Sequence, residues 1–204
     1  METLIKPPVE WAVAELSQRG ERESGDHYVA LVTPDVGLVA VVDGLGHGAE
    51  AARAAKAAVR ALEHGVDRPL VQVLRDCHRQ LMTTRGAVIS AAALDFREET
   101  MTWLGVGNVE GLLLRAPASR GARTQSLLAR GGVVGSHLPP LAAEVVPLRC
   151  GDTLILATDG IRSEFLDTTL PYLPPQALAD HVLTRWGTQT DDALVLVVRY
   201  VGSA

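Results

Sequence analysis

The sequence predicts an α+β fold in which two antiparallel sheets pack face to face and helices cover their outer faces. Three observations lead to this prediction. Strand-like segments follow one another closely at the start of the chain, two helical segments come next, and a second group of strands surrounds one further helix. Strands joined by short turns favour antiparallel hairpins over parallel βαβ units. Such sheets bury one apolar face against each other and the other against helices.

The N-terminal part is predicted to form a three-stranded meander followed by two helices. The strands are expected at residues 9–16, 27–33 and 38–42. An alanine-rich helix is expected over residues 48–64, with Gly65 suited to its C-terminal cap. A second helix is expected over residues 69–83, because apolar residues recur on one face. These residues are Leu70, Val73, Leu74, Cys77 and Leu81.

The C-terminal part is predicted to supply the remaining strands and the third helix. Strands are expected at residues 88–95, 100–106, 109–115, 125–129, 145–148, 153–158 and 193–200. A short helical piece is expected at residues 162–165 and a longer helix at 175–186. The glycine- and proline-rich residues 131–140 predict a flexible, substrate-facing flap.

Composition favours one folded domain over residues 1–204. The chain is 47% hydrophobic and carries a formal net charge of -5. This length allows a substantial core, and the hydrophobic content argues against disorder. The negative charge disfavours a broad nucleic-acid-binding face, so we expect no nucleic-acid partner.

The same survey predicts a cytoplasmic protein. The first eight residues lack the long apolar core of a signal peptide. No apolar stretch reaches the ~18 residues that a membrane span needs, so we expect no membrane partner. Cys77 and Cys150 have no metal-ligand spacing and do not suggest a secreted disulfide framework.

Aspartates recur where predicted strands begin or end. Asp43 and Asp159 each follow an apolar strand and precede a glycine, Asp191 and Asp192 stand just before the last strand, and Asp26 precedes another. Carboxylates that converge at one sheet edge repel unless a cation is bound. Oxygen ligands suit Mg²⁺ or Mn²⁺, and two such ions ~3.5–4 Å apart can hold a phosphoryl group. One Asp-Gly pair alone is explained by a turn, but the repeated context favours a metal centre.

These residues also carry a family resemblance. Asp43-Gly-Leu-Gly-His-Gly48, Ala157-Thr-Asp-Gly160 and Asp191-Asp192 before a final strand resemble the PPM (type 2C) metal-dependent protein phosphatases. The Gly-His-Gly form is similar to the bacterial branch that includes the sporulation and stress-response phosphatases. The chain length and the segments Gly105-Val-Gly-Asn108 and Gly132-Val-Val-Gly135 resemble the stressosome feedback phosphatases of that branch.

The resemblance implies a four-layer αββα sandwich and a centre of two ions, Mn²⁺ or Mg²⁺. Asp43 would bridge both ions and Gly44 would offer its carbonyl oxygen. The implied metal ligands are Asp26, Asp43, Gly44, Asp159 and Asp191, and the implied catalytic residues are Asp43, Asp159 and Asp191. The implied reaction is in-line attack of a metal-activated water on phosphoserine or phosphothreonine, without a phosphoenzyme. The implied partners are phosphorylated stressosome proteins.

Three assignments stay open at this point. Asp192 competes with Asp191 as the ligand from the last motif. Eukaryotic relatives often place a histidine directly after Asp-Gly, where this chain has leucine, so His47 is either a functional group or a cap of the following helix. Arg19 and Arg22 lie where relatives bind phosphate through an arginine, but neither matches securely.

Two other functions compete with the phosphatase. Gly44-x-Gly46-x-x-Ala49, with Glu63 further on, matches a relaxed dinucleotide-binding fingerprint. Asp43 would place charge beside a pyrophosphate, and the antiparallel meander is the wrong context for that motif. The second rival is an inactive phosphatase fold that regulates partners; the retained aspartates argue against it.

Overall fold

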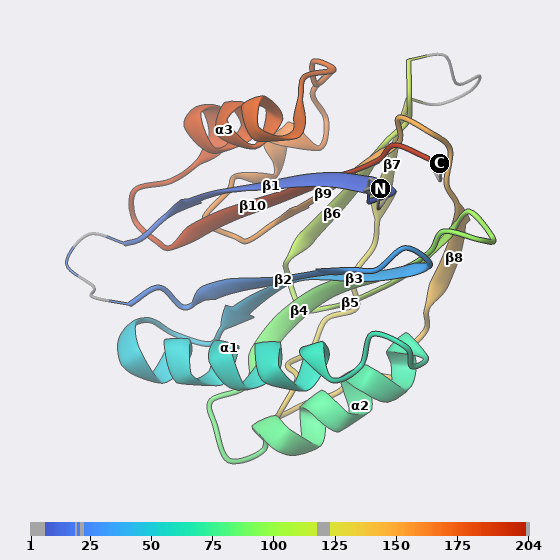
Figure 1. Cartoon of the computed structure of the whole chain (residues 1–204). Helices are drawn as coiled ribbons and strands as arrows, with labels where there is room; N and C mark the ends of the chain where they lie inside the picture. The colour runs from blue at the N-terminus through green and yellow to red at the C-terminus, as the bar shows by residue number, and fades with distance from the viewer. Residues whose placement is uncertain (1–6, 19, 21–22, 118–122, 203–204) are drawn as a thin grey trace, which may run out of the picture.

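The computed structural model describes residues 7–18, 20, 23–117 and 123–202. Two five-stranded sheets face each other, and helices cover the outer face of each (Figure 1). Helices α1 (Gly48–Glu63) and α2 (Leu70–Leu81) lie on one sheet, and α3 (Pro175–Trp186) lies on the other. The predicted αββα sandwich is therefore confirmed.

All ladders between neighbouring strands in both sheets are antiparallel. In spatial order, the first sheet contains β1 (Val9–Leu16), β10 (Ala193–Tyr200), β9 (Thr153–Ala157), β6 (Glu110–Leu114) and β7 (Thr124–Leu127). The second contains β2 (Asp26–Val32), β3 (Val36–Gly44), β4 (Ala87–Asp95), β5 (Thr100–Val106) and β8 (Glu144–Pro147). The strand before Asp43 therefore lacks the parallel βαβ context that the dinucleotide interpretation requires.

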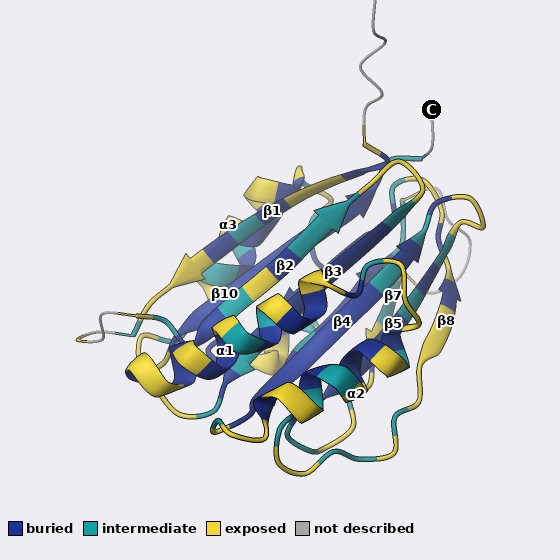
Figure 2. Cartoon of the chain, turned by 60° about the horizontal axis from the view of Figure 1, so that its bottom comes forward, coloured by how far each residue is buried: buried dark blue, intermediate teal, exposed yellow. Residues whose placement is uncertain are grey.

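The apolar run of β3 is continuous because both of its faces are buried. Val39 and Val41 join the core between the two sheets. Leu38, Ala40 and Val42 point to the opposite face, where α1 and α2 cover them. Figure 2 shows these helices lying across the sheet with their exposed stripes turned outward. Alternate strand residues thus fill two different layers of core.

The β2–β3 hairpin is tighter than the sequence suggested. The expected strands end at Thr33 and restart at residue 38, whereas β3 already starts at Val36. The Thr33 hydroxyl explains the difference, because it donates to the Val36 carbonyl oxygen at 2.9 Å and accepts from the Val36 N–H at 3.1 Å. Hydrogen bonds of this kind between a threonine hydroxyl and the backbone stabilise a short turn.

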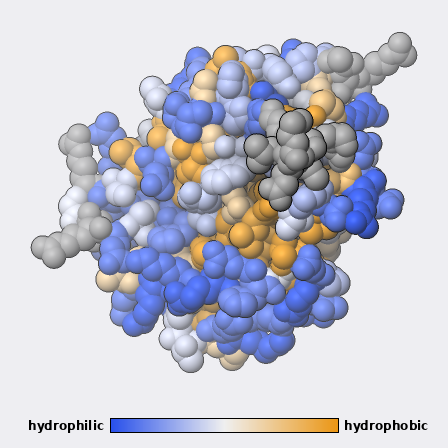
Figure 3. All heavy atoms as spheres, viewed as in Figure 1, coloured by the Kyte–Doolittle hydropathy of each residue, from blue (hydrophilic) through white to orange (hydrophobic). Residues whose placement is uncertain are grey.

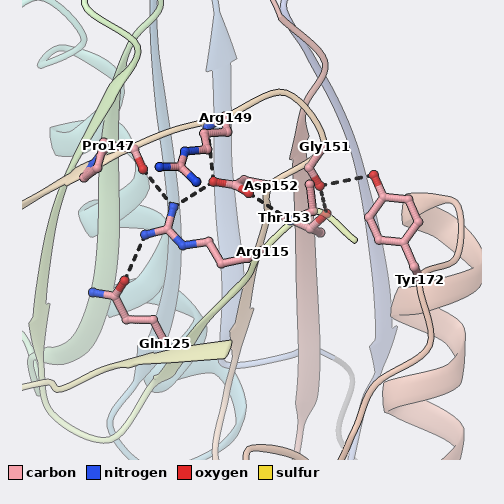
Figure 4. A network of polar contacts seen from close by, with 9 residues as sticks. Arg115, Gln125, Pro147, Arg149, Gly151, Asp152, Thr153 and Tyr172 are labelled. Atoms are coloured by element: carbon pink, nitrogen blue, oxygen red, sulfur yellow. Dashed lines mark hydrogen bonds and ion pairs between the residues drawn. The ribbon is translucent and has the colours of Figure 1, made fainter. Parts of the chain in front are cut away.

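A buried polar network joins the two sheets at one end of the sandwich (Figure 4). The Arg115 guanidinium donates to the Asp152 carboxylate at 2.7 Å and to the Pro147 carbonyl oxygen at 2.8 Å. Asp152 also accepts from the Ala116 N–H at 2.9 Å. Because Asp152 precedes β9 and Asp159 follows it, this network lies at the end of β9 opposite to the predicted metal centre.

Hydrophilic residues predominate on the face shown in Figure 3, and hydrophobic residues gather near its middle and at its upper left. Trp11 of β1 and Tyr28 of β2 are 42% and 36% exposed, and their ring centroids are 5.8 Å apart.

None of the described helices is long and apolar enough to cross a membrane.

Candidate metal centre

One cavity of about 550 Å³ collects every aspartate that the sequence singled out. Its wall includes Asp26, Asp43, Asp159, Asp191 and Asp192. The strand order explains this convergence. Asp26 and Asp43 face each other across the β2–β3 pair of one sheet. Asp159 follows β9 and Asp191 precedes β10, and these two strands are neighbours in the other sheet.

The glycines after Asp43 and Asp159 are required by close packing. A Cβ atom at Gly44 would lie 2.1 Å from the Ala51 carbonyl oxygen in α1, and one at Gly160 would lie 2.0 Å from the Asp192 carbonyl oxygen. Neither glycine has a positive φ. Asp43-Gly44 belongs to β3, and Asp159-Gly160 lies in a turn that the Ile161 N–H closes onto the Thr158 carbonyl oxygen at 2.9 Å. Neither place needs glycine for its backbone conformation, so packing accounts for both glycines. The missing side chains let α1 and the start of β10 approach the two strand ends.

The carboxylates lie around one cavity, and the partial loss of water around Asp26, Asp43 and Asp159 disfavours their charged forms. Burial raises the pKa of Asp43 to about 8, and the nearby Asp26 carboxylate adds to the rise. Burial likewise raises the pKa of Asp26 to about 7, although a hydrogen bond from the Thr158 hydroxyl at 2.7 Å acts in the other direction. The pKa of Asp159 is raised by burial and then by Asp191. The ion pairs found among the described residues include none of these four aspartates.

The structure separates the roles of Asp191 and Asp192. Both carboxylate oxygens of the buried Asp192 accept backbone hydrogen bonds, from the Gln18 N–H at 2.8 Å and the Gly25 N–H at 2.7 Å. Asp191 is exposed at the cavity, and among the described residues its carboxylate accepts only the short-range bond from the Asp192 N–H at 2.9 Å. Asp192 thus joins both ends of the β1–β2 loop to β10, and Asp191 keeps an oxygen for a ligand.

Asn108 is a site residue whose contact the sequence analysis did not foresee. Its side-chain amide donates to the Asp159 carboxylate at 2.8 Å. In the sequence, Asn108 ends the glycine-rich segment Gly105-Val-Gly-Asn108, which forms a bend between β5 and β6. That bend is the available signal, because it turns Asn108 back toward the end of β9. The expected flap also reaches the site, since Gly131, Gly132 and Val133 line the cavity.

His47 lines the cavity and occupies the N-cap position of α1, but its side chain makes no capping hydrogen bond. The interpretation of His47 as a side-chain cap is therefore wrong. His47 has the extended backbone that is usual at an N-cap position, but it lines the cavity and its side chain makes no capping bond to the first turn of α1. Arg19 and Arg22, the candidate phosphate-binding arginines, lie outside the described residues.

The donor set fits a hard divalent cation, although the side chains do not yet surround a metal position. Among the described residues, no three His, Cys, Asp or Glu side chains converge as a ready metal-binding group. The four aspartates in the wall, Asp26, Asp43, Asp159 and Asp191, nevertheless offer oxygen ligands, which Mg²⁺ and Mn²⁺ prefer. The raised pKa values of Asp26, Asp43 and Asp159 are those of carboxylates that lack a neutralising cation.

A comparison with known families decides the identity of this fold. The family model described as Stage II sporulation protein E (SpoIIE) matches residues 34–201. The chain belongs to the SpoIIE family. A curated relative of this SpoIIE-family protein is the phosphoserine phosphatase RsbX of Bacillus subtilis (strain 168), which is 23% identical over 153 residues that cover 75% of each chain.

Solved structures share the fold of this SpoIIE-family chain. One solved chain comes from a study that describes the bacterial stressosome as a modular system adapted to control secondary messenger signaling. It has a TM-score of 0.82 and 29% identity, and the match covers 94% of this chain and 99% of that one. RsbX in complex with magnesium has a TM-score of 0.80 and 20% identity, covering 94% of each chain. The catalytic domain of the serine threonine protein phosphatase PstP, in complex with two manganese ions, has a TM-score of 0.73 and 17% identity. The match covers 94% of this chain and 97% of that one.

These findings confirm the predicted family, the bacterial SpoIIE- and RsbX-like branch of the PPM (type 2C) phosphatases. They also confirm the predicted enzyme class, protein-serine/threonine phosphatase. The dinucleotide-binding and inactive-regulator alternatives are not favoured.

Proposed function

We propose that residues 1–204 form a single metal-dependent phosphatase domain that removes phosphate from phosphoserine or phosphothreonine in proteins. The proposed cofactor is a pair of Mn²⁺ or Mg²⁺ ions. The proposed ligands are the side chains of Asp26, Asp43, Asp159 and Asp191 and the carbonyl oxygen of Gly44. One observation carries this proposal: four carboxylates from two different sheets line one cavity, and none is ion-paired to a described cationic residue.

Each part of the site has a defined task in this mechanism. When bound, the divalent ions would supply an activated water at neutral pH and would neutralise charge on the phosphoryl group. Asp43, opposite Asp26 in the β-ladder, is the central ligand. The Thr158 hydroxyl and the Asn108 amide orient the carboxylates of Asp26 and Asp159 by hydrogen bonds of 2.7 and 2.8 Å. Such outer contacts fix the direction in which a ligand oxygen points.

The proposed substrate is a phosphorylated stressosome protein in bacterial stress signalling. Two findings support it: the resemblance to the phosphoserine phosphatase RsbX, and the 29% identity to a chain from a structural study of the stressosome. The extent of the cavity wall agrees with a protein substrate, because the wall reaches from the buried Asp26 to the exposed Gly131.

The test measures hydrolysis of p-nitrophenyl phosphate and of phosphorylated stressosome proteins, with Mn²⁺, with Mg²⁺ and with a chelator. We expect the chelator to abolish turnover and Asp43→Asn to lower it by more than about 100-fold. Asp67→Asn, at an exposed position on the loop before α2, is the matched control and should leave activity unchanged. Circular dichroism establishes that both variants fold. A folded wild type without activity under either ion would support the regulator instead.

A further inference from the structure

Residues 131–133, here called the arch, cross the wall of the carboxylate cavity. Gly131, Gly132 and Val133 all line this cavity, and Gly131 is exposed to solvent. The N-terminal end of the arch is held by the β5–β6 bend. The Arg130 N–H donates to the Gly105 carbonyl oxygen at 3.0 Å, and the Gly107 N–H donates to the Arg130 carbonyl oxygen at 2.8 Å.

The C-terminal end of the arch is held by β4 and α2. The backbones of Val134 and Ala87 exchange two hydrogen bonds of 2.9 Å, and Val134 is completely buried. The next N–H group, that of Gly135, donates to Nδ1 of His78 at 2.9 Å. In Figure 1 the yellow segment after β7 runs down to α2, which brings these two residues together although they are 57 positions apart.

The geometry at Gly135 makes His78 a specific partner. A backbone N–H always donates, so Nδ1 of His78 must present its lone pair, and the neutral ring then carries its proton on Nε2. Gly135 has a φ of +99°, and a Cβ atom there would lie 2.6 Å from the Cβ of Leu81. The chain therefore passes too close to α2 for a side chain, and its N–H is directed at the imidazole.

We propose that His78 is a positioning residue: it fixes the arch so that the substrate protein around the phosphorylated residue docks against residues 131–133. This inference rests on the proposed function. The phosphoryl group goes to the aspartates, whereas the arch, which is exposed at Gly131, meets the flanking polypeptide. Losing the hydrogen bond to Gly135 weakens docking of a protein substrate and leaves the chemistry at the carboxylates unchanged. A small aryl phosphate, which does not reach the arch, is insensitive to His78.

The experiment compares two nearly isosteric variants of the full chain. His78→Asn keeps an acceptor oxygen at the place of Nδ1, whereas His78→Leu removes it. Phosphocasein and p-nitrophenyl phosphate serve as the protein and small substrates, both with Mn²⁺. We expect His78→Leu to raise KM for phosphocasein about fivefold to tenfold, in line with the loss of one hydrogen bond. Its kcat, and both constants for p-nitrophenyl phosphate, should stay within about twofold of wild type, and His78→Asn should restore KM.

Gln80→Ala, on the exposed face of α2, is the control and should behave as wild type. The proposal would be overturned if His78→Leu raised KM equally for phosphocasein and for p-nitrophenyl phosphate. It would also be overturned if His78→Asn and His78→Leu had the same KM for phosphocasein. Hydrogen exchange over residues 131–135 gives a readout independent of turnover: exchange should accelerate in His78→Leu and not in His78→Asn. If wild type hydrolyses neither substrate, the proposed function fails, and the exchange comparison still decides whether His78 positions the arch. If His78→Leu does not fold, His78→Ala replaces it.

Discussion

Asp26 and Asp43 are directly opposite each other in the antiparallel ladder between β2 and β3, and both line the same cavity. Adjacent strands place opposed side chains only a few ångströms apart, so two charged carboxylates here destabilise the fold. Burial is the main cause that raises the pKa of Asp26 to about 7 and that of Asp43 to about 8, and the Asp26 carboxylate adds to the rise at Asp43. A divalent cation removes this destabilisation by neutralising both groups.

This arrangement predicts a metal-linked pH dependence of stability. For both aspartates the folded pKa exceeds the ordinary value of 3.8, so the folded state holds protons that the unfolded state has released. Without metal, the stability that these groups contribute is complete below about pH 4 and is lost as pH rises to about 8. Thermal melts should therefore show that Mn²⁺ raises Tm more at pH 8 than at pH 5. Asp43→Asn should reduce this difference; an equal Mn²⁺ effect at both pH values would contradict the prediction.

Asp191 and Asp192 should respond differently to the same substitution. Asp191→Asn is expected to weaken Mn²⁺ activation of p-nitrophenyl phosphate hydrolysis by at least about tenfold, with little change in Tm, because its side chain is exposed at the cavity. Asp192→Asn replaces an acceptor of two backbone N–H groups, so we expect a loss of about 1–3 kcal/mol in the free energy of unfolding. Titrations of Mn²⁺ and urea unfolding measure the two effects. The reverse pattern would assign the ligand to Asp192.

Thr158 is expected to control how firmly Asp26 is oriented. Its hydroxyl donates to Asp26 at 2.7 Å and accepts from the Leu194 N–H at 2.9 Å, so it joins the two sheets beneath the site. Thr158→Val keeps the shape but removes both bonds, and should lower the apparent Mn²⁺ affinity by about 10–100-fold. Thr158→Ser keeps the hydroxyl and is the control. Equal Mn²⁺ affinities in the Val and Ser variants would exclude this orienting role.

The fold and the aspartates were predictable because both depend on local pattern. Alternation and turn residues locate the strands, and a carboxylate at the end of an apolar run is visible in the sequence alone. The hydrogen bond that Asn108 donates to Asp159 joins residues 51 positions apart, and the one that the Gly135 N–H donates to His78 joins residues 57 positions apart. No local periodicity specifies such pairs; they depend on how the sheets pack.

The choice between Asp191 and Asp192 shows the same limit. Both are aspartates before the same strand, and only the loop ends at Gln18 and Gly25 distinguish them. The glycines after Asp43 and Asp159 are visible in the sequence, where a turn is the simplest explanation for them. The structure adds the reason that the sequence lacks, because Gly44 packs against Ala51 and Gly160 packs against Asp192. Local sequence thus predicts the proposed ligands, whereas the supporting roles proposed for Asp192 and for the two glycines rest on tertiary contacts.

Asp152 should affect stability without affecting the chemistry, because it lies at the end of β9 away from the cavity. Its side chain is fully buried, and that of its partner Arg115 is only 18% exposed. Asp152→Ala leaves the guanidinium without its carboxylate and also leaves the Ala116 and Arg149 N–H groups without an acceptor. Breaking a buried pair from one side costs about 3–5 kcal/mol.

Urea unfolding of Asp152→Ala measures this loss, and kcat for p-nitrophenyl phosphate should stay within about twofold of wild type wherever the variant is folded. Asp35→Ala is the matched control, since its ion pair with Arg97 is exposed on both sides and is worth less than about 1 kcal/mol. If Asp152→Ala and Asp35→Ala lose similar stability, the buried network does not hold the two sheets together. If Asp152→Ala loses kcat while remaining folded, the two ends of β9 are coupled.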